Sequence, residues 1–390
     1  MMPVSGPGSV VVVGAGIVGI SAAYFLAAKG LEVTVLDAAV PASGATGASD
    51  GAVSVTSKRD PYLIRLAQAG VQMYRDLAAQ GVLRDEFHPR PTYVIASSAG
   101  EADILRRHCK VLGAEGVIVD MLTPAEVDRE LPMLAQLPVA AARVPGDGHA
   151  IGYKVVHRLA QVAGLRVLRN AKVNGLIATG GKVTGVRTGL GDVAADAVLV
   201  AAGSGTVDLL GLQKATRPRK GQLIITERGP ASLARPAGPL MSSRYLASKT
   251  ASAGDVAIGA RTFGLVIDPL ETGQFLVGGT REDDRVTTEN DHTAVTRILS
   301  EAVALMPSLS GLRVLRTFSG VRLATADRLP IFGRVAGVKN LFVATGFEGD
   351  GISLGPLIGR AMQRLICGEE IGLDLSPLSA GRFDLTPRLV

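Results

Sequence analysis

The chain has few of the residues that build disulfides or metal clusters. It contains 390 residues but only 2 cysteines, Cys109 and Cys367, and 5 histidines. Disulfide frameworks and iron–sulfur or zinc sites need several suitably spaced thiols or imidazoles, so these two distant cysteines exclude them. We therefore expect reduced thiols, no resident metal and a cytoplasmic protein.

Tryptophan is absent, aromatic residues make up 4% of the chain, and no apolar run is long enough to span a membrane. The net charge of +6 is spread thinly, with one basic block at Arg217–Lys220. Nucleic-acid-binding proteins gather their cations on one face, so we expect no nucleic-acid partner. Because the first predicted strand begins near residue 10, we expect no signal peptide.

Glycine and apolar residues are abundant instead. There are 48 glycines, and 47% of the residues are hydrophobic. This composition is typical of an ordered α/β enzyme, and the length suffices for two domains with a sizeable core.

The stretch Ser9–Asp37 has the pattern of a single βαβ unit. Val10–Val13 is an all-apolar run, as expected of a parallel strand buried on both faces. Gly14, Gly16 and Gly19 follow with G-x-G-x-x-G spacing, which allows a tight turn, a close pyrophosphate and a closely packed helix.

The second half of this unit supports the same interpretation. A helix is predicted over residues 17–29, and its N-terminal N–H groups suit a phosphate. A second strand over residues 31–36 ends at Asp37, whose carboxylate can accept hydrogen bonds from ribose hydroxyls. The unit therefore predicts dinucleotide binding. A glycine-rich turn of another α/β unit is the alternative, and it leaves Asp37 without a role.

Further along, the pattern alternates between helices and strands. Helices are predicted over residues 61–80, 101–113, 122–132, 154–163, 291–306 and 357–366. An antiparallel meander is predicted over 171–196, a hairpin over 264–281, and buried strands over 197–201 and 339–344. We interpret His108 and Cys109 as structural, His149 as a turn residue and His157 as a surface residue. The polar segment 242–261 is either a lid or an insertion.

Several motifs in this order resemble the glycine/D-amino-acid oxidase family of FAD-dependent amine oxidases and dehydrogenases. They are the N-terminal glycine unit, a small-residue loop at 38–55, the AAG that ends a late strand, FSGVRLATADRLPIFG at 318–333 and ATGFEGDGISLGPLIGRAM at 344–362. The resemblance covers essentially the whole chain. The D-amino-acid, D-hydroxyproline and opine dehydrogenase β-subunit members are the most similar.

The resemblance implies an α/β fold with an FAD-binding Rossmann-like domain of the glutathione-reductase type. A substrate domain with a large antiparallel sheet accompanies it. The FAD-binding domain would comprise residues 1–85, 146–214 and 315–390. The substrate domain would comprise residues 86–145 and 215–314.

The resemblance also implies a set of residues that hold FAD. No cysteine lies near the implied flavin site, and Cys367 falls in the last predicted helix, so the FAD is expected to be non-covalent. The implied contacts are Gly14, Ala15, Gly16, Ile17, Val18, Gly19, Asp37, Ala38, Ser43, Gly44, Ala45, Thr46, Ala48, Ser49, Asp50, Gly51, Val173, Ala202, Gly203, Arg322, Gly346, Phe347, Glu348, Gly349, Asp350, Gly351, Ile352 and Ser353.

Arg322 matches the arginine that holds the substrate carboxylate in glycine-oxidase-like members, and a guanidinium can grip a carboxylate with two hydrogen bonds. The chain lacks the carboxylate-binding tyrosine of these members, because Val266–Ile267 occupies that strand. Tyr245 is a candidate substitute. Glu348 and Asp350 either pair with a cationic or secondary amine or serve as loop caps, and both interpretations stay open.

The implied activity is oxidation of the C–N bond of a small amino-acid-like substrate. Hydride transfer to flavin N5 would give an imine that hydrolyses. The substrate classes are D-amino acids, D-hydroxyproline or proline, glycine or sarcosine, and opines. A dehydrogenase is favoured over an oxidase. FMN or iron–sulfur partner subunits, a quinone or another electron-transfer acceptor would receive the electrons. Peripheral attachment at the inner membrane is an alternative to a cytoplasmic location. Its rivals are a flavin-binding subunit with little activity alone, another class of flavoprotein, and an NAD-dependent dehydrogenase.

Overall fold

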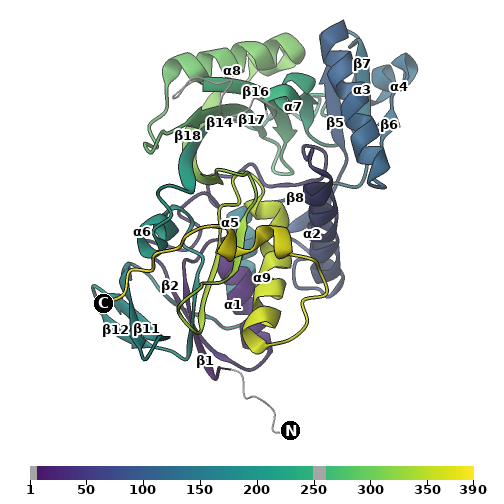
Figure 1. Ribbon diagram of the computed structural model, residues 1–390. Coiled ribbons are helices and arrows are strands. Elements are labelled where there is room, and N and C mark those ends of the chain that lie inside the picture. The colour runs from purple at the N-terminus through teal and green to yellow at the C-terminus, as the bar shows by residue number, and fades with distance from the viewer. Residues whose placement is uncertain (1–6, 249–260) are drawn as a thin grey trace.

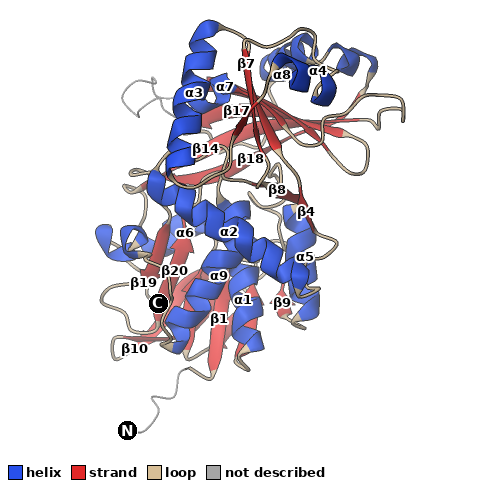
Figure 2. Ribbon diagram, turned by 90° about the vertical axis from the view of Figure 1, so that its right-hand side faces the viewer, coloured by secondary structure: helices blue, strands red, loops and turns tan. Residues whose placement is uncertain are grey.

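Two large sheets organise the chain, one above the other (Figures 1 and 2). The computed structural model describes residues 7–248 and 261–390. The lower sheet has six strands in the order β19-β20-β13-β1-β2-β9, and the upper sheet has eight in the order β18-β14-β17-β16-β15-β5-β7-β6. Two three-stranded sheets, β10-β11-β12 and β3-β8-β4, accompany them. The predicted combination of a Rossmann-like unit with a large antiparallel sheet is confirmed.

The six-stranded sheet is built around β1 (Ser9–Val13), which pairs in parallel with β2 (Glu32–Leu36) and β13 (Ala197–Val200). Every residue of Val10–Val13 is at most 4% exposed, which confirms a strand buried on both faces. The remaining strands are β9 (Arg166–Leu168), β20 (Leu341–Thr345) and the antiparallel edge strand β19 (Ile331–Arg334). The carboxyl ends of β1, β13 and β20 therefore lie together at one edge.

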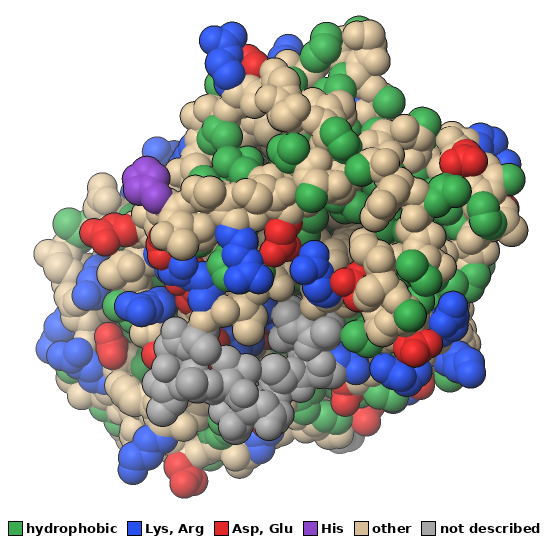
Figure 3. All heavy atoms as spheres, turned by 90° about the horizontal axis from the view of Figure 1, so that it is seen from above, with side chains coloured by type: hydrophobic (Ala, Val, Ile, Leu, Met, Phe, Trp, Pro, Cys, Tyr) green, Lys and Arg blue, Asp and Glu red, His purple; other side chains and the backbone are tan. Residues whose placement is uncertain are grey.

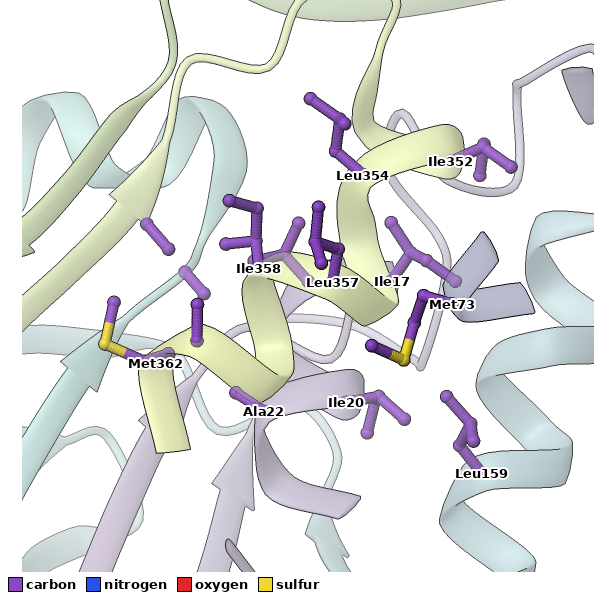
Figure 4. Close-up of a cluster of buried hydrophobic side chains, with 14 of the residues drawn as sticks. Ile17, Ile20, Ala22, Met73, Leu159, Ile352, Leu354, Leu357, Ile358 and Met362 are labelled. Atoms are coloured by element: carbon purple, nitrogen blue, oxygen red, sulfur yellow. The ribbon is translucent and has the colours of Figure 1, made fainter. Parts of the chain in front are cut away.

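Helices α1 (Ile17–Ala28) and α9 (Gly351–Cys367) pack side by side against this sheet (Figure 4). Gly355 and Gly359 allow the close approach, because a Cβ atom would lie 2.7 Å from Ile17 at the first and 2.6 Å from Ser21 at the second. Helices α2 (Pro61–Ala79) and α5 (Gly152–Val162) complete the layer. Figure 4 shows Ile17 beside Leu357 of α9, and Ile20 near Met73 of α2 and Leu159 of α5.

Helix α9 begins at Gly351, six residues before the predicted start at 357, and this prediction was wrong. Pro356 lies inside the helix and lacks the N–H that would bond to the carbonyl of Ile352. The hydroxyl of the buried Tyr74 donates a 2.8 Å hydrogen bond to that carbonyl instead. A residue distant in sequence thus supplies the missing donor, so the proline does not end the helix.

The eight-stranded sheet is antiparallel except where β15 (Leu240–Ser242) pairs in parallel with β5 (Thr92–Ala96). Its central strands are β14 (Thr216–Thr226), β16 (Arg261–Pro269), β17 (Phe275–Asp283) and β18 (Val314–Thr325). Strands β6 (Asp120–Met121) and β7 (Ala140–Val144) form its other edge. Helix α8 (His292–Leu305) covers one face, with α3 (Ala99–Ala114), α4 (Pro124–Glu130) and α7 (Ser243–Ser248) beside it (Figure 1).

Several local predictions are confirmed. The meander comprises β10 (Val173–Thr179), β11 (Lys182–Thr188) and β12 (Gly191–Ala194). Thr123 and Glu126 form a capping box at α4.

The prediction for His149 was wrong, because His149 is not a turn residue. It lies in β8 (Gly148–Ala150), is 4% exposed, and is placed between β3 (Ala52–Val53) and β4 (Phe87–Pro89). Of the segment 242–261, residues 243–248 form α7, and 249–260 lie outside the described residues.

Over the described ranges, no helix combines the length and hydropathy that crossing a bilayer requires. Figure 3 shows the upper face of the molecule, where Lys and Arg side chains alternate with Asp and Glu. The described part of that face is thus a surface of mixed charge.

Candidate active site

A cavity of about 560 Å³ runs between the two sheets, from the glycine turn after β1 to the lower face of the eight-stranded sheet. Its walls come from the small-residue loop, the ends of β13 and β20, and strands β14, β16, β17 and β18. The predicted contacts that line it are Gly14, Gly16, Ile17, Val18, Asp37, Ala38, Ser43, Gly44, Ala45, Thr46, Ala48, Ser49, Asp50, Val173, Ala202, Gly203, Arg322, Gly346, Phe347, Glu348, Gly349, Gly351 and Ile352.

The glycine turn at the nucleotide end requires its glycines for packing. Gly14 has φ +108°, and a Cβ atom there would lie 2.4 Å from the carbonyl oxygen of Ala201. A Cβ atom at Gly19 would lie 2.0 Å from the carbonyl oxygen of Gly14. Gly16 is the N-cap of α1 and brings no capping side chain, so the helix N-terminus faces the cavity. A glycine turn that leads into a helix N-terminus fits the pyrophosphate of FAD.

Asp37 has a second role that the sequence did not reveal. Its two carboxylate oxygens accept hydrogen bonds from the backbone N–H groups of Ala15 and Ala39, each at 2.8 Å. A carboxylate has about four acceptor positions, so two of these bonds still leave capacity for ribose hydroxyls. Asp37 therefore holds the glycine turn in shape while lining the cavity.

The small-residue loop is tied directly to α1. The Thr46 hydroxyl accepts a 3.1 Å hydrogen bond from the N–H of Ile17, and the Ser49 hydroxyl donates to the carbonyl of Thr46 at 2.8 Å. The loop thus follows the N-terminus of the helix and forms one cavity wall with small side chains. Such a wall suits a large flat ligand.

Five predicted cofactor contacts do not line the cavity: Ala15, Gly19, Gly51, Asp350 and Ser353. Gly51 packs against His149, whose Nε2 would lie 2.5 Å from a Cβ atom at that position. Ser353 is 2% exposed, and its hydroxyl donates to the carbonyl of Ala52 at 3.0 Å. These residues support the walls from behind.

Arg322, on β18, lies at the opposite end of the cavity. Its Nη2 donates a 3.3 Å hydrogen bond to the carbonyl of Thr280 and would lie 2.7 Å from a Cβ atom at Gly221. Its Nη1 lies 3.4 Å from the Cβ position of Gly349, in the loop between β20 and α9. Burial, together with the positive charge of Arg281, lowers the pKa of Arg322, yet an arginine stays charged at neutral pH. The guanidinium thus faces the cavity from a glycine-lined recess.

Glu348 and Asp350 both pair with cations of the chain itself. The Glu348 carboxylate contacts Arg219 at 2.9 Å and Arg281 at 2.6 Å. Asp350 contacts the Lys58 ammonium at 2.7 Å, and the Lys58 side chain is 5% exposed. Asp350 is the N-cap of α9, but its side chain makes no capping hydrogen bond.

Tyr245, on α7, lines the cavity beside β16. Its ring occupies space that Gly264 leaves free, because a Cβ atom at Gly264 would lie 2.3 Å from the ring. The Arg281 guanidinium carbon lies 5.9 Å from the ring centroid, and burial raises the pKa of the Tyr245 hydroxyl. This candidate tyrosine therefore comes from a helix and lies near both Arg281 and Arg322.

Sequence reasoning missed the cations that surround these acidic residues. None of the residues Lys58, Arg219 and Arg281 belongs to a recognisable motif, although Arg219 lies in the basic block Arg217–Lys220. It also missed the cavity-lining Asp268, which is bound by Arg90 at 2.6 Å. Alternating polar positions along predicted strands were the only available signal, and they do not reveal which strands pair.

Comparison with known proteins supports a flavin site. A glycine oxidase from Geobacillus kaustophilus is 27% identical over 388 residues, covering 96% of each chain. The hydrogen cyanide synthase subunit HcnC from Pseudomonas aeruginosa is 25% identical over 430 residues, covering 98% of this chain and 97% of that protein. A crystal structure of glycine oxidase from Geobacillus kaustophilus superposes with a TM-score of 0.84 at 25% identity, covering 97% of this chain and 99% of the other.

A family model also matches most of the chain. The model described as FAD dependent oxidoreductase (DAO) matches residues 9–365, which include the glycine turn, the small-residue loop and Arg322. Because the match spans both large sheets and the cavity between them, the chain belongs to the DAO family of FAD-dependent oxidoreductases.

Proposed function

We propose that this chain oxidises the C–N bond of an amino acid or secondary amino acid and that Arg322 holds the substrate carboxylate. Membership of the DAO family supports an FAD-dependent amine or amino-acid oxidoreductase. The observation that carries the finer proposal is the position of Arg322. Its guanidinium faces the cavity at the end remote from the glycine turn, within 3.4 Å of the Cβ position of Gly349 in the loop that precedes α9.

When bound, FAD supplies the hydride acceptor. The residues of the chain supply position and a protected site. Arg322 would fix the distance and angle of the substrate carboxylate, because a guanidinium fork binds both carboxylate oxygens. Tyr245 would offer a second donor to that carboxylate from its own side of the cavity. No side-chain base is needed if the amine binds unprotonated, and Glu348 is already paired with two arginines.

We also propose the division into an FAD-binding and a substrate-binding part, with one change of boundary. Strand β18 (Val314–Thr325) pairs with β14 along its whole length, so we assign residues 315–325 to the substrate part. The arginine that grips the substrate then belongs to the sheet that forms the substrate end of the cavity.

The candidate substrates are D-amino acids, D-hydroxyproline or proline, glycine or sarcosine, and opines. We propose a dehydrogenase that passes electrons to FMN or iron–sulfur subunits, a quinone or another electron-transfer acceptor. The relative HcnC is named as a subunit of hydrogen cyanide synthase, which favours an alternative. In that alternative, the chain is the flavin-binding subunit of a larger enzyme and has little activity alone.

The test is an anaerobic titration of the purified holoenzyme, followed by the visible flavin band. D-proline, D-hydroxyproline, glycine, sarcosine, D-alanine, octopine and nopaline form the panel. Bleaching by one class identifies the substrate, and the rate at which colour returns in air separates oxidase from dehydrogenase. Reduction by dithionite but by no amine refutes catalysis by this chain alone and supports the subunit alternative.

A further inference from the structure

A second arginine, Arg281 on β17, also lines the cavity and has no role in the function proposed above. Its side chain is 12% exposed, and its Nη2 contacts Glu348 at 2.6 Å. Its Nε is buried and has no hydrogen-bond partner among the described residues. A guanidinium carries five N–H donors, so Glu348 does not exhaust its capacity. Leaving a buried donor unpaired is unfavourable, so this guanidinium is suited to a further anion.

The neighbouring Arg219, on β14, does not offer the same capacity. Its Nε and Nη2 both donate to Asp283, and its Nη1 contacts Glu348 at 2.9 Å. Both edges of its fork are therefore occupied by carboxylates of the chain. Of the arginines in this cluster, Arg281 and Arg322 are the ones that line the cavity.

The charges around these residues do not balance. Four arginines lie in this cluster, Arg217, Arg219, Arg281 and Arg322, and the carboxylates that face them are those of Asp283 and Glu348. Four positive charges against two negative charges leave an excess of two. Asp50 also lines the cavity and interacts with Tyr245. With Asp50 counted, four positive charges face three negative charges, so the cluster keeps an excess of positive charge that favours an anionic substrate.

We propose that the substrate is an amine carrying two carboxylates, one bound by Arg322 and the other by Arg281. This inference rests on the proposed function and narrows it. The second carboxylate is attached either to the nitrogen substituent, as in an iminodicarboxylate, or to the side chain, as in an acidic amino acid. Both share the chemistry that Arg281 recognises, and the substrates tested below separate them.

The binding test uses two thioethers that cannot be oxidised as amines, (methylthio)acetate and thiodiacetate. They differ by one carboxylate, and their binding to the holoenzyme is measured from the change in the visible flavin spectrum. We expect thiodiacetate to bind about 10- to 100-fold more tightly than (methylthio)acetate, because it makes one additional charge-assisted contact. In R281Q this preference should fall to about threefold or less, because the second carboxylate loses its partner.

Two further variants show whether Arg281 itself is responsible. R281K keeps the positive charge but loses the forked guanidinium, so part of the preference for thiodiacetate should survive. If R281Q does not retain FAD, R281K takes its place in the test. R316Q is the matched control, because Arg316 is an exposed arginine on β18 that stacks on Phe318 with a guanidinium-to-centroid distance of 5.4 Å. We expect R316Q to keep the full preference.

The amine arm compares iminodiacetate with sarcosine and D-aspartate with D-alanine, as anaerobic rates of flavin reduction. Faster reduction by the dicarboxylate of either pair supports the proposal and identifies where the second carboxylate is attached. Reduction by monocarboxylates alone, with equal affinity for the two thioethers, overturns the two-carboxylate proposal and leaves the proposed function standing. Reduction by no amine overturns the proposed function, and this inference falls with it whatever the thioethers show.

Discussion

Replacing Arg322 with methionine is the most direct test of the proposed carboxylate grip. Methionine has a similar length but no charge and no N–H donor. The guanidinium lies over Gly221 and donates to the carbonyl of Thr280 at 3.3 Å. Burial and Arg281 both lower its pKa, so the folded protein gains no electrostatic stability from this charge. We therefore expect R322M to fold and to retain FAD.

The expected loss follows from the two hydrogen bonds that a bidentate grip provides. Hydrogen bonds to charged groups are worth about 1.5–3 kcal/mol each, so two contribute about 3–6 kcal/mol. At ~1.36 kcal/mol per factor of ten, the second-order rate constant of flavin reduction should fall by about 10²- to 10⁴-fold. The assay is anaerobic stopped-flow reduction at several substrate concentrations, with R316Q as the matched control on the same strand.

A pair of substrates separates loss of the grip from general damage. If proline reduces the flavin, pyrrolidine is the matched amine without a carboxylate, and R322M should affect it by about threefold or less. A uniform loss with both amines would point to a disturbed cavity. A rate with proline within about threefold of the wild-type value would refute the assignment of Arg322, since even one charge-assisted hydrogen bond is worth more than that.

Three further predictions concern the architecture. In K58M the Asp350 carboxylate loses the ammonium group that lies 2.7 Å away, and we expect the free energy of unfolding to fall by about 3 kcal/mol. The double variant K58M/D350N should largely restore it, and urea unfolding measures both effects. In G14A the new Cβ atom would lie 2.4 Å from the carbonyl oxygen of Ala201, at a backbone φ of +108°. The purified variant should therefore contain little FAD, as measured by absorbance. In the control G189A the Cβ atom meets nothing within 4 Å, so this variant should contain a full complement of FAD. Burial and Arg90 lower the pKa of His149 to about 3, so this imidazole takes up its proton in the unfolded chain first. The contribution of His149 to stability should therefore fall by ~1.4 kcal/mol per unit as pH drops from about 6.5 toward 3. Urea midpoints should show a shallower pH slope in H149Q, and an unchanged slope would contradict the burial argument.

The nucleotide end of the cavity could be predicted because its signals are local. The glycine spacing, the buried valine run and the position of Asp37 all fall within about thirty residues, and each reflects a backbone requirement that only certain residues meet. Even there, the two backbone bonds that Asp37 accepts escaped prediction. They depend on the tight turn that brings Ala15 next to the end of β2.

The ion pairs of the substrate end could not be predicted, because they join residues far apart in sequence. Lys58 and Asp350 are separated by 292 positions, and Arg281 and Glu348 by 67. Sequence periodicity gives the face of a strand but not its neighbours in the sheet. The same limit explains the early start of α9, where Tyr74 supplies the donor that Pro356 lacks.

The loop between β20 and α9 connects the two ends of the cavity. Glu348 fixes it to β14 and β17 through two arginines, while Asp350 fixes it to Lys58 just before α2. The same loop contains Gly349, whose Cβ position is 3.4 Å from Arg322. Reactions between positioned groups lose rate steeply when the distance changes by about 1 Å. Ion pairs on both sides of this loop therefore hold the proposed flavin wall at a defined distance from the arginine that would orient the substrate, which is the structural requirement for hydride transfer.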